Sequence, residues 1–246
     1  MNKPHIVVGC PVYERAWSLP KWFSSLRKET ANFKISLAFI RTPDEDGTLE
    51  MLERGCGDDA FELHEIATYE GKGEDSTHDW TSEEKVRAVA EKRNLLLDLA
   101  ASFDPDYFLS LDSDTYMSEG GLARLVEGLS KGYDAISPKV LIWGSTLACM
   151  RYVKGLLTCV PRKGVGIQPV DVVTTSAVLM TKKLLMDKTV RYGVFVRGKD
   201  FDWHPGGLSV DGWDASEMFA WSAKAKGAGY KLALHYDLEF EHRMKA

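Results

Sequence analysis

The chain has 246 residues, a net charge of -5 and 44% hydrophobic residues, which is the composition of a folded domain with a sizeable core. The mild acidity argues against an extended nucleic-acid surface, and no apolar run reaches the roughly 18 to 20 residues that cross a bilayer. The first residues lack the apolar core of a signal peptide, and the scattered cysteines form no C-x-x-C pair, so we expect a cytoplasmic protein with reduced thiols and no membrane partner.

Short apolar runs alternate with helical patterns over the first half of the chain. The β-branched and apolar runs predict strands at residues 5–10, 34–40, 61–66 and 106–111. Apolar residues at helical spacing predict helices at residues 15–29, 48–54 and 83–103. Strands that alternate with helices favour an α/β fold, with a mostly parallel central sheet flanked by helices.

The second half has longer strand-like runs with short connections, over residues 134–160 and 169–181. These runs predict a smaller antiparallel element. Residues 196–215 are rich in glycine, aspartate and aromatics, which predicts a long functional loop, and a helix follows at 215–230. No repeat or low-complexity linker interrupts the chain, so we predict a single domain over residues 1–246.

Polar residues follow three of the predicted parallel strands, at residues 11–15, 41–46 and 112–114. The carboxyl ends of parallel strands meet at one edge of the sheet, where ligands bind. Asp112 and Asp114 repel each other unless a positive charge lies nearby, and hard divalent cations bridge carboxylates to phosphate. Aspartates that only cap a turn are the alternative. The position at a strand end favours a site for a metal and a nucleotide phosphate.

The helix and strand "EKRNLLLDLAASFDPDYFLSLDSD" resemble those of glycosyltransferases of the GT-A fold, in which a D-x-D motif closes the strand after a helix carrying an Arg-Asn pair. The resemblance implies that Arg93 and Asn94 contact the nucleotide of the donor, together with Asp112 and Ser113. The alternative is that Arg93 and Asn94 lie on the solvated face of the helix. The resemblance also divides the domain into a nucleotide-binding half, 1–116, and an acceptor-binding half, 117–246.

Two turns extend the resemblance. The segment "GCPVYERAW" is similar to the family's first loop, which cups the base and ribose, and this implies four donor-binding residues: Pro11, Val12, Tyr13 and Glu14. The segment "RTPDEDGT" is similar to the family's "DDGSTDGT". Arg41 and Thr42 stand where the family keeps acids that read the base, so the choice between a UDP- and a GDP-sugar stays open, and Arg41 is expected to contact donor phosphate or acceptor.

A third match concerns the catalytic base. "SEMFAWSAKAKGAGYK" is similar to the family's "GEDVDFCLRAREAGFK". Glu217 keeps the first acid, whereas Met218 replaces the second, which often serves as the base. The resemblance therefore implies Glu217, Asp214 or Asp211 as the catalytic carboxylate. Asp214 as a helix N-cap with Glu217 as its capping-box partner is the alternative.

The resemblance also implies metal and acceptor residues. A late histidine often approaches the metal in the family, which implies His242, or else His235, beside Asp112 and Asp114 as ligands of Mn²⁺ or Mg²⁺. The loop at 196–215 offers three residues suited to binding a sugar acceptor: Trp203, His204 and Trp213.

These features together predict a metal-dependent glycosyltransferase that moves a sugar from a UDP- or GDP-sugar to a hydroxyl. The acceptor stays open between a glycan, a protein, a small molecule and a modified nucleic-acid base, and so does the choice between retention and inversion. One alternative is a nucleotidyltransferase, but the first strand lacks the Gly-rich phosphate loop of such enzymes. The other is an inactive binding module with the same fold, which only Met218 favours.

Overall fold

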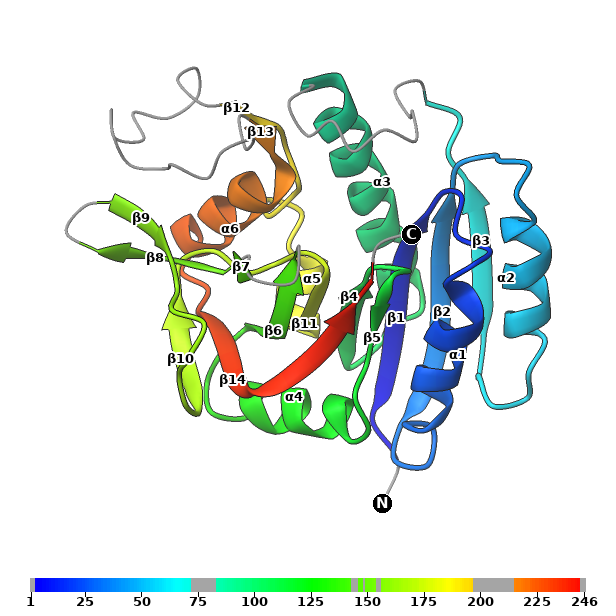
Figure 1. The fold of residues 1–246 in the computed structure, drawn as a ribbon, viewed down its shortest axis with the longest axis horizontal. Helices are drawn as coiled ribbons and strands as arrows, with labels where there is room; N and C mark the ends of the chain where they lie inside the picture. The colour runs from blue at the N-terminus through cyan, green and yellow to red at the C-terminus, as the bar shows by residue number, and fades with distance from the viewer. Residues whose placement is uncertain are drawn as a thin grey trace.

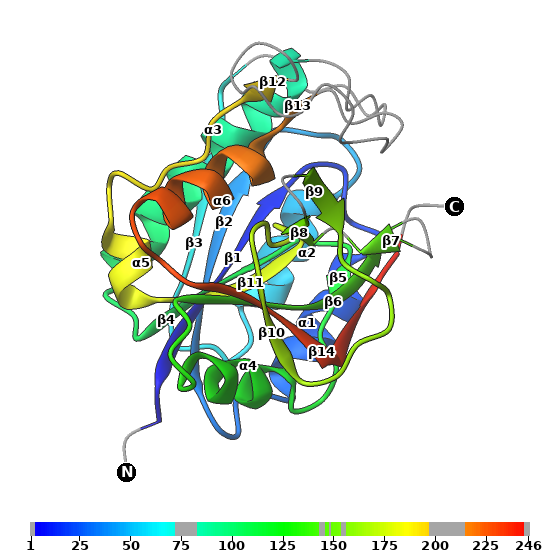
Figure 2. The same cartoon turned by 90° about the vertical axis from the view of Figure 1, so that its left-hand side faces the viewer.

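The computed structural model describes residues 3–71, 83–142, 146–147, 149–153, 156–196 and 215–243. A central sheet lies between helices on both of its faces (Figures 1 and 2). The described helices are α1 (Leu19–Arg27), α2 (Thr48–Cys56), α3 (Glu83–Ser102), α4 (Gly121–Leu129), α5 (Lys182–Met186) and α6 (Glu217–Gly227). Figure 2 shows α3, α5 and α6 on the side of the sheet opposite to α1 and α2.

The main sheet has the strand order β10-β14-β6-β11-β4-β1-β2-β3, with β5 pairing to β14 and β7 to β6. Its first strands are β1 (His5–Val12), β2 (Lys34–Arg41), β3 (His64–Thr68), β4 (Tyr107–Leu111) and β5 (Thr115–Tyr116). The later strands are β6 (Ala135–Ile142), β7 (Thr146–Leu147), β10 (Ile167–Val170), β11 (Ala177–Thr181) and β14 (Leu232–His242). Two small antiparallel pairs lie outside it: β8 (Met150–Val153) with β9 (Leu156–Cys159), and β12 (Phe195–Val196) with β13 (Ala215–Ser216).

The parallel half confirms the predicted α/β architecture, because β1 pairs in parallel with β2 and β4, and β2 with β3. The third strand begins at His64, later than predicted, since residues 61–63 approach the sheet without full pairing and Phe61 packs against Phe23 at 6.1 Å. The first helix begins at Leu19, because the backbone N–H of Ser18 donates to the carbonyl of Arg15 in a turn before it.

The antiparallel half also forms, since β11 runs antiparallel to both β4 and β6, and β10 to β14. One pairing differs from the expected pattern, because β14 runs parallel to β6. The helix α6 returns the chain to the point where β6 starts, and the N–H of Ala135 donates to the carbonyl of Lys231 there. The short helices α4 and α5 were not predicted.

Alternation along the strands divides the core between the two faces of the sheet. Ile6, Val8 and Cys10 of β1 join one apolar cluster with α1, α2 and α4, whereas Val7 joins the other cluster with α3, α5 and α6. Such alternation is expected for a sheet that is covered on both faces. All four cysteines are free, as predicted. Within the described ranges, no helix is both long and apolar enough to cross a membrane.

Two helical glycines allow a matched test of packing against α1. A Cβ on Gly55 would lie 2.1 Å from the ring of Phe23, which is buried, whereas a Cβ on Gly227 would meet no atom within 4 Å. We expect Gly55→Ala to destabilise the fold by about 1–3 kcal/mol through overpacking. Gly227→Ala should be neutral or stabilise by up to about 1 kcal/mol, because alanine favours helix.

Thermal unfolding of both variants measures the difference in their stability. The midpoint of Gly55→Ala should be lower by several degrees, on the order of 2–4 °C for each kcal/mol. Equal midpoints for the two variants would show that the ring of Phe23 moves aside without cost.

Candidate functional site

The two aspartates lie on the turn that follows β4, at the edge where β1 and β2 also end. The backbone holds this turn, since the N–H of Asp112 donates to the carbonyl of Ser176 at 2.9 Å and that of Thr115 to the carbonyl of Asp112 at 2.9 Å. Ser113 between them is buried, and its hydroxyl interacts with the thiol of Cys10. The turn therefore presents the two carboxylates in a fixed place.

Asp114 lies between two groups that carry or accept positive charge. One of its oxygens is 3.6 Å from Nη2 of Arg15, and the other is 3.6 Å from Nε2 of His242. Burial and the neighbouring Asp112 raise the pKa of Asp114, while Arg15 and His242 oppose the shift. A carboxylate in this setting is stabilised in its charged form by an added cation.

The long strand β14 brings His242 to this place. Its last residues pair with β5, so that His242 lies opposite Thr115, next in the chain to Asp114. His235 sits earlier on the same strand, opposite Ile167 of β10. Of the two candidate histidines, the structure therefore brings His242 to the aspartates.

Asp114 and His242 are suited to a divalent cation that shares its coordination with phosphate. The described residues contain no group of three His, Cys, Asp or Glu side chains arranged as a metal cage. Mg²⁺ and similar cations in phosphate-binding sites usually take only one or two protein carboxylates, with phosphate and water as the other ligands. A carboxylate oxygen and an imidazole nitrogen 3.6 Å apart fit that arrangement.

Arg93 of α3 is buried beneath the turn, with 5% of its surface exposed, so it does not lie on a solvated face. Its Nη2 donates to Oδ1 of Asp112 at 2.9 Å, and its Nη1 donates to the hydroxyl of Ser110 at 3.2 Å and the carbonyl of Thr175 at 3.3 Å. Its Nε lies 3.3 Å from Oε1 of Glu217. Burial lowers the pKa of Arg93, but Asp112 and Glu217 together raise it above its ordinary value.

Asn94 joins α3 to the segment before β12. Its Nδ2 donates to the carbonyl of Tyr192 at 3.0 Å, and its Oδ1 accepts the backbone N–H of Tyr192 at 2.8 Å. The ring of Tyr192 stacks on Trp221 of α6, with centroids 5.7 Å apart. The amide of Asn94 therefore acts within the protein in this structure, and contact of Arg93 or Asn94 with a nucleotide stays a prediction.

The first turn of α6 holds Glu217 and Met218. Glu217 is buried and accepts a hydrogen bond from the hydroxyl of Thr175 at 3.0 Å, and Met218 is buried as well. The N-cap of the helix is Ser216, so the alternative of Asp214 as N-cap is wrong. The predicted residues Asp211, Asp214, Trp203, His204 and Trp213 lie outside the described residues.

The predicted donor loops interlock at the ends of β1 and β2. Pro11 and Val12 end β1, and Val12 accepts the N–H of Thr42 at 3.0 Å. Glu14 has a positive φ of 49°, and its N–H donates to the carboxylate of Asp44 at 3.1 Å. Nη1 of Arg15 donates to the carbonyls of Tyr13 and Glu14, at 3.1 and 3.2 Å. These contacts fix a ridge of backbone beside Asp114.

Arg41, at the end of β2, pairs with an aspartate of the turn that follows. Its Nη2 lies 3.4 Å from the carboxylate of Asp44, whose side chain is only 1% exposed. The acid of this turn is therefore directed inward and engaged with protein. Nε of Arg41 and the hydroxyl of Thr42 are buried, and neither has a hydrogen-bond partner among the described atoms.

Lys92 lies near the charged residues of the candidate site, and sequence reasoning missed it because a lysine on a helix usually lies in solvent. It is buried, and its Nζ is 5.7 Å from the centre of the Tyr69 ring. Burial lowers the pKa of Lys92 to about 7, and the neighbouring charges of Arg93 and Arg15 add to this effect. In the sequence, only its position next to Arg93 could have indicated that Lys92 lies near the site.

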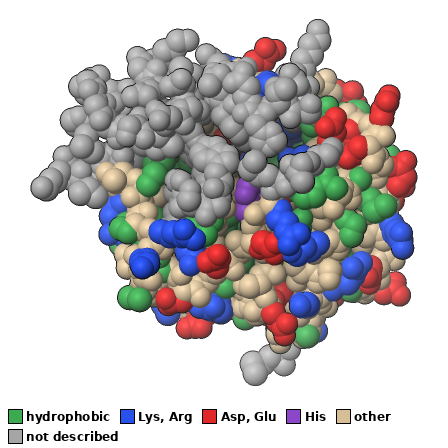
Figure 3. Space-filling model, viewed as in Figure 1, with side chains coloured by type: hydrophobic (Ala, Val, Ile, Leu, Met, Phe, Trp, Pro, Cys, Tyr) green, Lys and Arg blue, Asp and Glu red, His purple; other side chains and the backbone are tan. Residues whose placement is uncertain are grey.

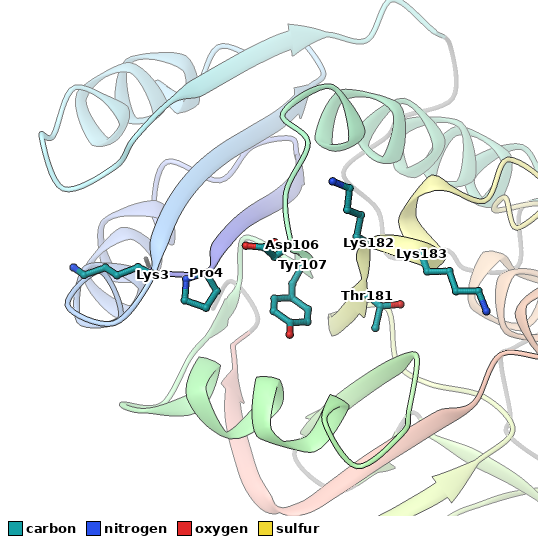
Figure 4. A pocket seen from close by; sticks show the side chains of 7 residues that line it. All are labelled: Lys3, Pro4, Asp106, Tyr107, Thr181, Lys182 and Lys183. Atoms are coloured by element: carbon teal, nitrogen blue, oxygen red, sulfur yellow. The ribbon is translucent and has the colours of Figure 1, made fainter. Parts of the chain in front are cut away.

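A shallow hollow of about 510 Å³ lies at the opposite edge of the sheet, where β1 and β4 begin (Figure 4). Its lining residues are Lys3, Pro4, Asp106, Tyr107, Thr181, Lys182 and Lys183. Two of its lysines have protein partners, since Nζ of Lys3 donates to the carbonyl of Thr30 and Nζ of Lys182 pairs with Asp104. Over the face drawn in Figure 3, the described acidic and basic side chains are interspersed.

Neither a protein-family model nor a curated protein sequence matches the chain. Solved structures match it over nearly its whole length. Residues 1–349 of S. aureus TarS, in complex with UDP-GlcNAc, align with a TM-score of 0.60 and 14% identity over 98% of this chain and 59% of that one. The mannosyltransferase PcManGT from Pyrobaculum calidifontis, in complex with GDP-Man and Mn²⁺, aligns with a TM-score of 0.58 and 12% identity over 98% and 57%.

A further match is A197 from STIV, with a TM-score of 0.53 and 12% identity over 98% of this chain and 86% of that one. The chain thus spans less than two thirds of the TarS and PcManGT chains. At these identities the likeness concerns the fold. It agrees with the α/β fold described above, with its largely parallel central sheet and small antiparallel element. The chain therefore has the GT-A fold of glycosyltransferases such as TarS and PcManGT.

Proposed function

We propose that the protein is a metal-dependent glycosyltransferase that moves a sugar from a UDP- or GDP-sugar to a hydroxyl acceptor. The observation that carries this proposal is the placement of Asp114, with Arg15 and His242 each 3.6 Å from its carboxylate, where β1, β2 and β4 end. The fold supports it, since TarS was solved with UDP-GlcNAc and PcManGT with GDP-Man and Mn²⁺.

In this proposal, the residues around Asp114 bind the cation and the nucleotide of the donor. Asp114 and His242, with the accessible part of Asp112, would hold the cation, which when bound stabilises the negative charge that develops on the diphosphate leaving group. Arg15 adds a second positive charge beside Asp114. The ridge from Pro11 to Arg15 supports the nucleoside, and the hydrogen bond from the N–H of Glu14 to Asp44 helps to keep it rigid. Preorganised charges and dipoles of this kind cost no rearrangement during the reaction.

Polar groups near the end of β2 belong to the same donor site. Arg41, whose side chain is 12% exposed, is the residue there that is proposed to meet the donor. The acceptor side is proposed to lie toward α6 and the segment before it, where Glu217, Asp214 and the residues Trp203, His204 and Trp213 belong. A glycan, a protein, a small molecule and a modified base all carry a suitable hydroxyl.

The second candidate is a binding module that retains the fold and the donor site without turnover. Two observations favour it: Met218 occupies the place of an acid and is buried, and Glu217 is engaged with Arg93 and Thr175. Release of nucleoside diphosphate from UDP- or GDP-sugars in the presence of Mn²⁺ separates the two candidates, because only the enzyme releases it.

The first prediction concerns the metal. Asp114→Asn removes the charge that faces His242 and Arg15, so we expect Mn²⁺-dependent release of nucleoside diphosphate to fall at least about 100-fold. Stabilisation of the fold by UDP or GDP with Mn²⁺ in a thermal-shift assay should be lost as well.

Asp104→Asn is the matched control, because Asp104 is 75% exposed at the other edge of the sheet and its positive φ of 51° suits asparagine. It should retain both properties. Mn²⁺-dependent turnover at the wild-type rate in Asp114→Asn would exclude the metal role.

A second prediction uses the buried lysine. Its pKa of about 7 lies below the unfolded value of 10.5, so between these two values the unfolded chain binds more protons and stability rises with pH. Lys92→Met should remove this rise and stabilise the fold at pH 7 by about 1–4 kcal/mol. It should also weaken binding of UDP or GDP, because a positive charge near Arg15 is lost.

Chemical denaturation at pH 7 and pH 9, together with nucleotide titration, measures both effects. Lys188→Met is the control, since Lys188 is 62% exposed and pairs with Asp98. A pH dependence of stability that is the same in wild type and Lys92→Met would contradict the prediction.

A further inference from the structure

We propose that Glu217 is a positioning residue and not the general base: it holds Arg93, and Arg93 in turn holds Asp112 in place for the donor and its cation. This inference rests on the proposed function, and it assigns a role to the contacts that join α6 to the D-x-D turn.

The guanidinium of Arg93 connects the two carboxylates directly. It donates to Asp112 at 2.9 Å through Nη2, and its Nε lies 3.3 Å from Glu217 on another side. Nε makes no hydrogen bond within the described part of the chain, so the contact with Glu217 is ionic attraction rather than an aligned hydrogen bond. A buried guanidinium keeps its charge and requires opposite charge close by. Asp112 and Glu217 supply it from two elements.

Two further contacts restrict where Arg93 can lie. The ring centre of Tyr192 is 5.9 Å from its guanidinium carbon, and Tyr192 is itself fixed by Asn94 and stacked on Trp221. Nη1 is held by the hydroxyl of Ser110 and the carbonyl of Thr175. These contacts together hold the guanidinium in place. Its hydrogen bond to Oδ1 of Asp112 then fixes the position of that carboxylate.

Glu217 is unsuited to remove a proton from an acceptor. A general base must come within hydrogen-bond reach of the acceptor hydroxyl, roughly 2.6–3.2 Å. The side chain of Glu217 is only 7% exposed, and its Oε1 accepts from Thr175 while facing Arg93. The side chain of Asp112, in contrast, is 24% exposed, so part of its carboxylate stays accessible at the ligand edge.

Through Arg93, Glu217 therefore connects α6 to the turn that carries Asp112. α6 follows the segment assigned to the acceptor, whereas Asp112 belongs to the donor turn. If Glu217 fixes Arg93, then a displacement of the first turn of α6 changes the charge that faces the donor and its cation. Loss of Glu217 should therefore appear as weaker binding of metal and nucleotide, not as loss of a proton acceptor.

The test is the isosteric variant Glu217→Gln, which keeps an oxygen for Thr175 and loses the charge that attracts Arg93. We expect its affinity for Mn²⁺, measured by electron paramagnetic resonance with and without UDP or GDP, to fall about 10-fold, as is typical for residues that orient a metal ligand. Donor turnover at saturating Mn²⁺ should fall less than about 10-fold, and the acidic limb of the pH profile should remain.

Two variants complete the design. Glu217→Asp keeps the charge, so it should bind Mn²⁺ more tightly than Glu217→Gln, and it provides the comparison if Glu217→Gln folds poorly. Glu127→Gln is the matched control, because Glu127 is 70% exposed on α4 and pairs only with Lys131 among the described residues. Thermal unfolding of each variant checks that the fold is retained.

The outcomes separate this inference from the proposed function. If wild type binds Mn²⁺ neither alone nor with UDP or GDP, both are overturned. If wild type turns over a donor, but Glu217→Gln loses more than about 100-fold of the turnover at unchanged affinity for Mn²⁺ and nucleotide, Glu217 is the base and only this inference is overturned. Equal behaviour of Glu217→Gln and wild type in every measurement also overturns it.

Discussion

A buried positive charge must be balanced from within the protein, and Arg93 is such a charge at the centre of this fold. Its partners come from separate elements, with Ser110 on β4, Asp112 on the next turn, Thr175 before β11 and Glu217 on α6. Arg93 can be buried only because these elements pack so that its charge is paired and hydrogen-bonded. The same arrangement places the two aspartates, so stability and the candidate site depend on one interaction.

The candidate site also shows how charge is divided at the edge of the sheet. Asp112 faces Arg93 in the interior, whereas Asp114 faces Arg15 and His242 toward the ligand edge. The two carboxylates of the motif are therefore not equivalent: Arg93 holds Asp112 and leaves part of its carboxylate accessible, whereas Asp114 has no such buried partner and lies where an added cation lowers its free energy. The raised pKa of Asp114 reflects this difference, since burial and Asp112 both disfavour its charge.

Local patterns predicted the parallel half well, because β1, β2 and β4 are mostly apolar runs and α3 carries some of its apolar residues at helical spacing. The parallel pairing of β14 with β6 was not predicted, since it depends on where α6 returns the chain. The motif placed Asp112 and Asp114 at the right edge. The burial of Lys92 and Arg93 could not be predicted from the sequence, because hydrophobic periodicity assigns charged residues to the exposed face of a helix.

The pairing of β5 with the end of β14 has a consequence for how the site comes into being. Thr115 and His242 are far apart in the sequence, yet they lie opposite each other beside Asp114. Contacts between such distant residues form late, because closing the long intervening chain costs entropy that only the rest of the fold recovers. The first four strands can therefore assemble around an incomplete acidic turn, and the proposed cation site is complete only when the last described strand docks.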